Sequence, residues 1–181
     1  MDKYDVVVGL EIHCQMNTKT KLFCGCSNDS ENAEPNTNTC PVCMGFPGQL
    51  PVTNKQAINK GIQAGLALGC RIAKRSVFDR KNYFYPDSPK GYQITQQFHP
   101  IALEGAVEIE TSQGNKSIRI HRMHLEGDAG KLTHTSTGSL VDFNRCDTPL
   151  MEIVSEPDIN SVEEATSYAR EMQRIIRYSR T

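Results

Sequence analysis

The stretch VVVGLEIH, residues 6–13, has the clearest strand pattern of the chain and contains two candidate functional groups. Three β-branched residues, followed by alternating apolar and polar residues, predict a buried strand over residues 4–14. Because successive side chains of a strand point to opposite faces, Glu11 and His13 would share one face, and the apolar residues beside them would face a core. A carboxylate and an imidazole on one rigid strand form part of a possible metal site. The other interpretation is an exposed strand face with two ordinary polar residues.

Length and composition are typical of one domain, or a domain and a half, with a moderate core: the chain has 181 residues, of which 38% are hydrophobic. No apolar run approaches the roughly 18 residues of a membrane helix, and the N-terminus lacks the basic and apolar regions of a signal peptide. We therefore expect a cytoplasmic protein that does not enter membranes. A net charge of −1 gives no general affinity for nucleic acid, so RNA contacts would need local basic patches or further parts of a longer chain.

Two capping boxes predict the helices. Thr53 as N-cap, with Gln56 three residues later, predicts a helix over residues 54–68 that is capped by Gly69 and packs closely through its glycines. The expected apolar face comprises Ile58, Ile62, Gly65, Leu66 and Gly69. A second box at Ser161 begins another helix. Its expected apolar stripe comprises Val162, Ala165, Ala169, Met172 and Ile176, and its solvated face carries Arg170, Arg174 and Arg177.

The remaining patterns are those of strands and turns. Alternation predicts a short strand over 92–96, a hairpin of 107–110 with 117–124 around the turn 113–115, and strands over 140–144 and 150–154. Adjacent hairpins, with helices that do not alternate with strands, indicate an α+β fold: a mainly antiparallel sheet with flanking helices. Neither glycine-rich phosphate-loop motif occurs, so a nucleotide would have to be held by metal and side chains.

Four cysteines lie in the segment 22–51, which is too rich in Pro, Asn, Ser and Thr to pack as a helix or a long strand. The pairs Cys24-Gly25-Cys26 and Cys40-Pro41-Val42-Cys43 are separated by thirteen residues. Two converging thiolate pairs suit tetrahedral zinc, which would stabilise a loop that has no core of its own. The alternative is four reduced structural thiols, and the remaining cysteines (Cys14, Cys70 and Cys146) are expected to be small core residues.

A second group of candidate ligands is carried by strands. His124 and Glu126 repeat the spacing of Glu11 and His13, and Glu152 is a lone carboxylate in an apolar strand. Buried carboxylates are costly unless they are paired or bind metal. Three carboxylates and His13 would form an oxygen-rich site that holds a divalent ion against phosphate oxygens, and on ligand softness alone the imidazole favours manganese or zinc over magnesium.

Five runs of the sequence, in order, closely resemble one family: GLEIHCQMNTKTKLFCGCSND, EPNTNTCPVCMGFPGQLPVTNKQA, FDRKNYFYPDSPKGYQITQ, HLEGDAGK and LVDFNRCDTPLMEIVSEPD. The family is the B subunit of the aspartyl/glutamyl-tRNA amidotransferase, and the resemblance covers residues 4–178. The chain departs from the family pattern at Cys146-Asp147, where two small residues are usual, and at Gly127, where an acidic residue is usual. Residues 1–181 resemble only the N-terminal part of the catalytic domain, without the family's helical and tail domains.

The resemblance implies a fold of the glutamine synthetase type and an ATP-dependent ligase that amidates Glu-tRNA(Gln) or Asp-tRNA(Asn). By this resemblance, magnesium is held by Glu11, His13, Glu126 and Glu152, and zinc by Cys24, Cys26, Cys40 and Cys43. Weaker candidates for contacts to the nucleotide or the tRNA acceptor end are Lys81, Tyr83, Lys90, Asn144 and Arg145, for which structural roles are the alternative. The implied partners are a glutaminase-type A subunit, a small C subunit and the misacylated tRNA.

Two classes of function follow. The first is one component of the amidotransferase, active only within a complex. The second is a zinc-stapled truncated fragment that has no catalysis of its own and at most binds a partner subunit. An in-frame continuation of the gene after residue 181 would favour the first.

Overall fold

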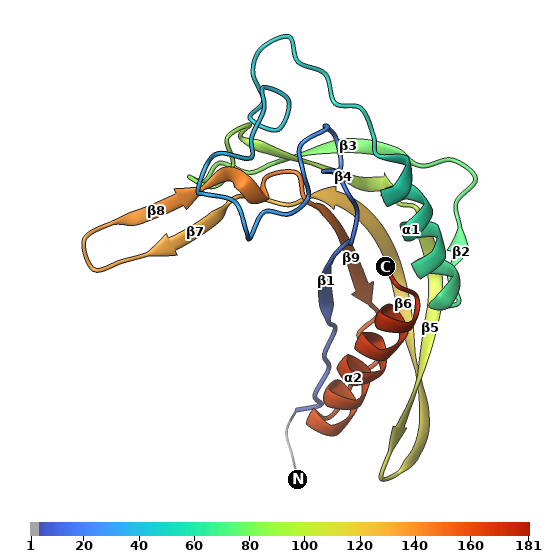
Figure 1. Ribbon diagram of the computed structural model, residues 1–181. Helices are drawn as coiled ribbons and strands as arrows, with labels where there is room; N and C mark the ends of the chain where they lie inside the picture. Colours follow the sequence, from blue (N-terminus) through green and yellow to red (C-terminus); the bar gives the residue numbers. More distant parts are fainter. Residues whose placement is uncertain (1–3) are drawn as a thin grey trace.

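The computed structural model describes residues 4–181 and places five strands in one antiparallel sheet (Figure 1). The sheet order is β1-β9-β6-β5-β2, formed by Glu11–Gln15 (β1), Arg71–Ile72 (β2), Ala102–Thr111 (β5), Gly114–Gly127 (β6) and Pro149–Ser155 (β9). Two separate ribbons pair Val77–Asn82 (β3) with Tyr92–His99 (β4), and Lys131–His134 (β7) with Ser139–Asp142 (β8). The predicted α+β class with a mainly antiparallel sheet is confirmed.

Both helices contact the five-stranded sheet and cover one of its faces (Figure 1). They span Lys55–Ala67 (α1) and Val162–Tyr178 (α2), and a short 3-10 helix covers Phe143–Arg145. The close packing expected from the glycines of α1 is confirmed: a Cβ atom on Gly65 would lie 2.8 Å from Ile72 Cδ1 and 3.0 Å from Ala102 Cβ. In residues 4–181, neither helix is long and apolar enough to cross a membrane.

The first helix begins one residue later than the capping box predicted. Asn54, and not Thr53, is the N-cap, and its side chain accepts a hydrogen bond of 2.8 Å from the Gln56 N–H. Leu68 is the C-cap, and Gly69 follows it at φ +66°, a conformation that favours glycine. The predicted apolar face was wrong at Leu66, which is 63% exposed. Because the helix lies so close to the sheet, small residues fill the contact: Ala57, Gly61, Ala64 and Gly65 are buried.

The second helix begins as predicted, with the Ser161 hydroxyl accepting from the Glu164 N–H at 3.1 Å. The predicted apolar stripe was partly wrong, because Val162 is 84% exposed and Ala169 is also exposed. The buried face is centred between Tyr168 and Met172, and at about 100° per residue Val162 and Ala169 lie about 80–100° from that centre. The three arginines, Arg170, Arg174 and Arg177, are exposed as expected.

The opening strand is shorter than predicted. Strand β1 covers only Glu11–Gln15, and the valines at 6 and 7 are 58% and 61% exposed, so the expectation of a buried strand over 4–14 was wrong for its first half. The reason lies in the partner strand: Glu11 pairs with Val154, and β9 ends one residue later. Among residues 4–10, the pairing continues as a hydrogen bond from the Ser155 N–H to the Leu10 carbonyl and an isolated bridge between Val8 and Ile159.

Other strand boundaries also moved. The hairpin of β5 and β6 is confirmed but longer, turning at residues 112–113, with Gly114 at φ +112° opening β6. The predicted strand 140–144 ends at Asp142, whose side chain caps the 3-10 helix by accepting from the Asn144 N–H. Strands β2, β3 and β7 have no counterpart among the predictions.

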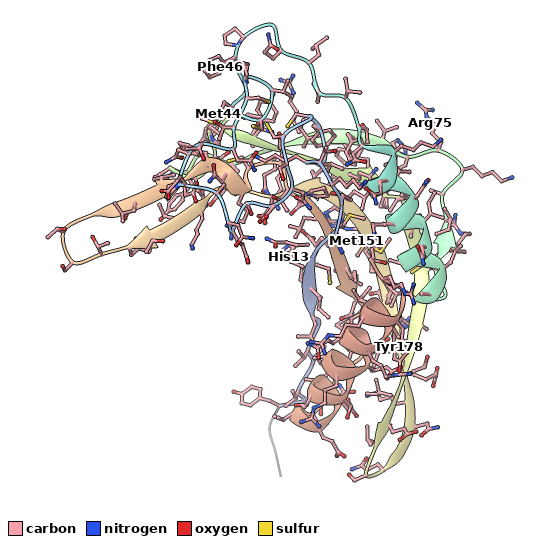
Figure 2. All side chains as sticks on the ribbon, in the orientation of Figure 1. His13, Met44, Phe46, Arg75, Met151 and Tyr178 are labelled. Atoms are coloured by element: carbon pink, nitrogen blue, oxygen red, sulfur yellow. The ribbon has the colours of Figure 1, made fainter. Side chains whose placement is uncertain are left out.

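Strand alternation separates an apolar face from a polar face of the sheet. In register, His13 and His124 both lie opposite Glu152, while Cys14 and Leu125 lie opposite Met151. The apolar side, which includes the fully buried Met123, Leu125, Met151 and Ile153, packs against the helices and forms the core. Figure 2 shows His13 projecting away from the helices. As predicted, Leu10, Ile12 and Cys14 pack against the core.

Candidate active site

Four predicted ligands from three strands converge on the polar face of the sheet. The His13 Nε2 atom lies 3.5 Å from Glu11 Oε1, 3.9 Å from Glu126 Oε1 and 3.2 Å from Glu152 Oε2. The antiparallel register produces this arrangement, because β9 lies between β1 and β6 and sets Glu152 between His13 on β1 and His124 on β6. The assignment of these residues as metal ligands stays a prediction.

Burial differs sharply across this cluster. The side chains of Glu126 and Glu152 are 2% and 5% exposed, whereas those of Glu11 and His13 are about half exposed, at 54% and 48%. The cluster is therefore closed toward β6 and open toward solvent at β1. A ligand could approach from the β1 side without any rearrangement of the sheet.

One oxygen of the buried Glu126 carboxylate lacks a hydrogen-bond partner among the described residues. Its Oε2 atom has no hydrogen-bond partner within residues 4–181, and the nearby His124 Nε2 lies 3.8 Å away, beyond hydrogen-bond distance. Burial raises the pKa of Glu126, but its interactions with the side chains of His124, Lys81 and Thr95 outweigh burial and lower this pKa below its usual value. An ionised, buried carboxylate with an unpaired oxygen fits a cation site, and carboxylate oxygens with imidazole nitrogens are suitable donors for a divalent ion.

His124 is a member of this cluster that the predicted ligand set did not include. It is buried, it lies 3.6 Å from Glu152 Oε2, and its Nδ1 atom has no hydrogen-bond partner among the described residues. The available signal was its two-residue spacing from Glu126, which places both side chains on one strand face.

The weaker candidates divide by exposure. Lys81, near the end of β3, is exposed and close enough to Glu126 to lower its pKa. Tyr83 is half-buried, and burial together with Asp87 raises its pKa. Lys81 lies on β3 and Tyr83 directly follows this strand. The partner strand β4 contacts β6, and Gln93 donates to the Gly127 carbonyl at 3.2 Å. Contacts of Lys81 and Tyr83 with a nucleotide stay a prediction.

Lys90, Asn144 and Arg145 already have protein partners. The Lys90 ammonium forms a buried ion pair with Asp147. The fully buried Asn144 accepts from the Asn38 N–H and donates to the Glu34 carbonyl, both at 2.8 Å. Arg145 donates to the carbonyls of residues 129 and 130 at 3.0 and 2.7 Å. These contacts support structural roles, and the predicted ligand contacts of the three residues stay untested.

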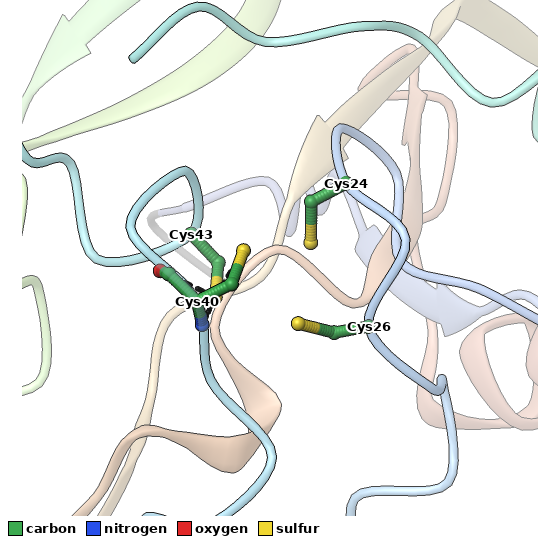
Figure 3. A group of neighbouring side chains, drawn as sticks. All are labelled: Cys24, Cys26, Cys40 and Cys43. Atoms are coloured by element: carbon green, nitrogen blue, oxygen red, sulfur yellow. Dashed lines mark hydrogen bonds between the residues drawn. The ribbon is translucent and has the colours of Figure 1, made fainter. Parts of the chain in front are cut away.

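The four predicted zinc ligands also converge (Figure 3). Cys24 and Cys26 come from one turn and face Cys40 and Cys43 from another, with all four sulfur atoms within 4.8 Å of one another. The Cys40 and Cys43 sulfurs are 3.8 Å apart, the separation of about 3.8 Å expected for two thiolates in a tetrahedron with Zn–S bonds of about 2.3 Å. The donor set and spacing therefore fit zinc.

The electrostatics of the cysteine cluster favour one thiolate. The interaction with Cys24, the Cys40 backbone N–H and the Lys21 ammonium outweigh burial and lower the pKa of Cys43 to about 5. Conversely, the contact between Cys24 and Cys43 raises the pKa of Cys24, and burial raises the pKa of Cys26 to about 11. Lys21 was not predicted to matter, yet its side chain is fully buried, with Nζ 2.9 Å from the Asn38 carbonyl and 3.8 Å from Cys43 Sγ.

Fold and site together define an α+β domain with a strand-borne carboxylate–imidazole cluster and a separate four-cysteine cluster. The chain belongs to the family described as the GatB/GatE catalytic domain, which it matches over residues 6–181. It is 55% identical over 181 residues to the B subunit of the aspartyl/glutamyl-tRNA(Asn/Gln) amidotransferase of Brevibacillus brevis, an alignment that covers 99% of this chain. It is 54% identical over 182 residues to the B subunit of the same name from Thermotoga maritima, with 97% of this chain covered.

The curated relatives are much longer than this chain. Each of these two alignments spans 38% of the relative, as does a third, 55% identical, to the corresponding B subunit from Geotalea uraniireducens. The family resemblance predicted from the sequence motifs is confirmed for the region that the chain covers.

Proposed function

We propose that this chain forms part of the catalytic domain of the B subunit of an ATP-dependent tRNA amidotransferase, a ligase that activates the side-chain carboxylate of Glu-tRNA(Gln) or Asp-tRNA(Asn). The observation that carries the proposal is the convergence of Glu11, His13, Glu126 and Glu152 on one sheet face, in a chain of this family. The names of the relatives support the substrate class.

The proposed chemistry has two steps. A carboxylate oxygen of the misacylated amino acid attacks the γ-phosphorus of ATP, the bond to the β–γ bridging oxygen breaks, and ADP leaves. Ammonia then attacks the carbon of the acyl phosphate, the bond from this carbon to the phosphate oxygen breaks, phosphate leaves, and the nitrogen loses a proton to water. A glutaminase-type A subunit would release the ammonia from glutamine, and a small C subunit would complete the complex.

The first step brings two negatively charged groups together, so it requires charge neutralisation and in-line positioning more than covalent help. A magnesium ion, when bound, supplies the neutralisation. Glu11, His13, Glu126 and Glu152 would hold it, and their strands, which in this proposal form a fold of the glutamine synthetase type, would fix their positions. The exposed side of the cluster at Glu11 and His13 suits the approach of phosphate oxygens. Lys81 and Tyr83 would contact the nucleotide or the acceptor end, with Lys90, Asn144 and Arg145 as weaker candidates.

The cysteine cluster has a different proposed role. Zinc on Cys24, Cys26, Cys40 and Cys43 would hold the loop in place and take no part in the reaction. Among the described residues of the loop from 24 to 51, Cys43 is the one buried apolar side chain, so a metal would replace the missing core.

The test is Glu126→Gln in the complete amidotransferase complex carrying this domain. Removing the carboxylate charge should reduce ADP formation with Glu-tRNA(Gln) by about 100-fold or more, a loss typical of an electrostatic catalytic group. Glutamine hydrolysis by the A subunit should continue, because the ammonia source is untouched. His121→Gln is the matched control, since His121 lies exposed on the same strand and pairs with Glu156. Full ADP formation in E126Q would refute the proposed role.

The second candidate is a zinc-stapled fragment without catalysis, which at most binds a partner subunit. The alignment covers 38% of the Brevibacillus brevis relative, which is the reason to test the 181 residues by themselves. The chain would be mixed with ATP, magnesium, ammonium and Glu-tRNA(Gln), and Gln-tRNA would be measured. Turnover would show that these residues form a complete active site and would exclude the fragment interpretation.

A further inference from the structure

Lys21 is the only fully buried lysine in the part of the chain that the structure describes, and neither cluster as proposed above uses it. A buried ammonium is costly unless an anion and hydrogen-bond acceptors compensate it. Among residues 4–181, no carboxylate forms an ion pair with Lys21. Asp147 is close enough to interact with it electrostatically, but Asp147 is already paired with Lys90. The anion that compensates Lys21 is therefore of another kind.

The contacts of the ammonium point to a cysteine sulfur. Its Nζ atom donates to the Asn38 carbonyl at 2.9 Å and to Cys43 Sγ at 3.8 Å. The backbone holds it there, because the Lys21 N–H donates to the Cys26 carbonyl at 3.0 Å, within the turn that carries the first cysteine pair. The Cys43 sulfur also accepts from the Cys40 N–H at 3.1 Å. Lys21 thus belongs to one half of the cluster and contacts a sulfur of the other half.

Zinc in this cluster would leave a surplus of negative charge. Four thiolates around one Zn²⁺ give a net charge of about −2. Water can screen the charge on the three partly exposed cysteines, but Cys43, which Lys21 contacts, is buried. A fixed cation beside Cys43 compensates part of the surplus where water does not, and the ammonium gains the anion that it otherwise lacks.

We propose that the Lys21 ammonium is the built-in counter-charge of the zinc site, acting on the metal through the Cys43 sulfur. The inference rests on the zinc assignment of the proposed function and adds to it a positioning residue that is not a ligand. Groups that hydrogen-bond to metal ligands tune the metal, and loss of one typically weakens metal binding about 10–100-fold. Lys21 therefore helps to set how tightly the loop holds zinc.

The test compares zinc affinity in three variants of the chain by competition with a chromogenic chelator. Lys21→Met keeps the apolar stem but removes the charge, and should weaken zinc binding about 10–100-fold. Lys21→Gln, which keeps a hydrogen-bond donor without the charge, should weaken it similarly. Lys19→Met, at an exposed lysine two residues earlier, is the matched control and should bind zinc like the unmodified chain. Unchanged affinity in K21M, or full affinity in K21Q, would overturn the counter-charge role.

Cobalt separates an effect of charge from a loosened loop. In Co²⁺-loaded chains, the sulfur-to-cobalt charge-transfer absorption should move to lower energy in K21M and K21Q, because a nearby positive charge no longer stabilises the sulfur electrons. A loss of the tetrahedral Co²⁺ spectrum without this shift would indicate a purely structural role and overturn the proposal. If neither variant folds, nitrogen NMR of the zinc-loaded unmodified chain decides. Lys21 should then be an ammonium whose protons exchange slowly with water, and a neutral amine would overturn the proposal.

Failure of the zinc assignment itself gives a different result. Elemental analysis that finds no zinc in the unmodified chain would overturn the zinc site and the role of Lys21 together. Bound zinc in the unmodified chain, with the same affinity and the same cobalt spectrum in K21M, would leave the zinc site standing and remove only the role of Lys21.

Discussion

The carboxylate–imidazole cluster and the cysteine loop differ in what holds their side chains in place. The first is carried by three paired strands, in which His13 and His124 both lie opposite Glu152. The second lies in a segment with no helix or named strand between residues 24 and 51. Its backbone bonds are mostly those of turns, such as Met44 N–H to the Cys40 carbonyl at 3.0 Å.

The two clusters should therefore respond differently to loss of metal. A backbone ladder and an apolar core position the strand-borne ligands before any ion binds. Directly before the cysteine loop, Leu22 and Phe23 are buried, and the Phe23 ring packs edge-on against Phe78. Beyond that point, metal binding and folding of the loop should be linked.

The largest expected effect is that of Cys40→Ser or of removing zinc with a chelator. Structural zinc sites supply about 10–16 kcal/mol of apparent binding energy, so loss of one thiolate should open the loop while the sheet stays folded. Hydrogen exchange should show lost protection over residues 24–51 and retained protection in β6 and β9.

Cys14→Ser is the matched control, because Cys14 lies on β1 outside the cysteine cluster. It should retain one zinc per chain. The zinc assignment fails if elemental analysis finds no zinc in the unmodified chain and all four thiols react freely under native conditions.

The next largest effect is expected from a substitution in the core of the sheet, which should destabilise the sheet and leave the cysteine loop unchanged. Met151 is fully buried between β1 and β6, and Met151→Ala should lower the free energy of unfolding by about 2–5 kcal/mol through the cavity that it leaves. Denaturant titration would measure this loss, with zinc content unchanged. Leu66→Ala, at a site 63% exposed, should cost far less. Equal losses in the two variants would contradict the assignment of the core.

A smaller loss of stability is expected where the cysteine loop is hydrogen-bonded to Asn144 of the 3-10 helix. Asn144→Ala would leave the Asn38 N–H and the Glu34 carbonyl without their buried partner and should cost about 1–3 kcal/mol. Hydrogen exchange of the Asn38 amide should accelerate. Asn32→Ala, which removes an exposed bond to Asp29 inside the loop, is the control. Unchanged exchange at Asn38 would show that the loop does not depend on this junction.

Much of the site was predictable because it depends on local alternation. The two-residue spacing of Glu11 and His13 placed both on the polar face, and the lone carboxylate at Glu152 indicated a special role for that strand position. The cysteine pairs likewise indicated a cluster. The same two-residue spacing relates His124 to Glu126 and places both on the polar face. Strand alternation does not show which polar residues of a face are buried, so the burial of His124 was not predicted.

The parts that failed depend on tertiary pairing. Val6 and Val7 have strong β propensity, yet β9 ends before it can pair with them. The exposure of Val162 follows from how α2 is rotated on the sheet, which its own sequence does not specify. Lys21 lies in a polar turn segment by composition, and its burial depends on contacts with Asn38 and Cys43, which follow it by 17 and 22 residues.

The smallest effect concerns the pH stability of the sheet and comes from the ion pair of Arg119 on β6 with Asp158. The guanidinium donates to both carboxylate oxygens, at 2.8 and 2.6 Å, and lowers the pKa of Asp158 to about 2. Because this pKa is depressed below the unfolded value of about 3.9, the contribution is complete above pH 4 and is lost as the pH falls through 2.

Arg119→Gln should therefore lower stability slightly at neutral pH, with the difference from the unmodified chain disappearing below about pH 2. The effect should be small and should weaken in salt, since the Arg119 side chain is mostly exposed and the Debye length is about 10 Å at 0.1 M salt. Urea titrations at several pH values, at low and high salt, would measure it. A difference that grows as the pH falls would have the wrong sign for a depressed carboxyl pKa and would exclude this pair as its source.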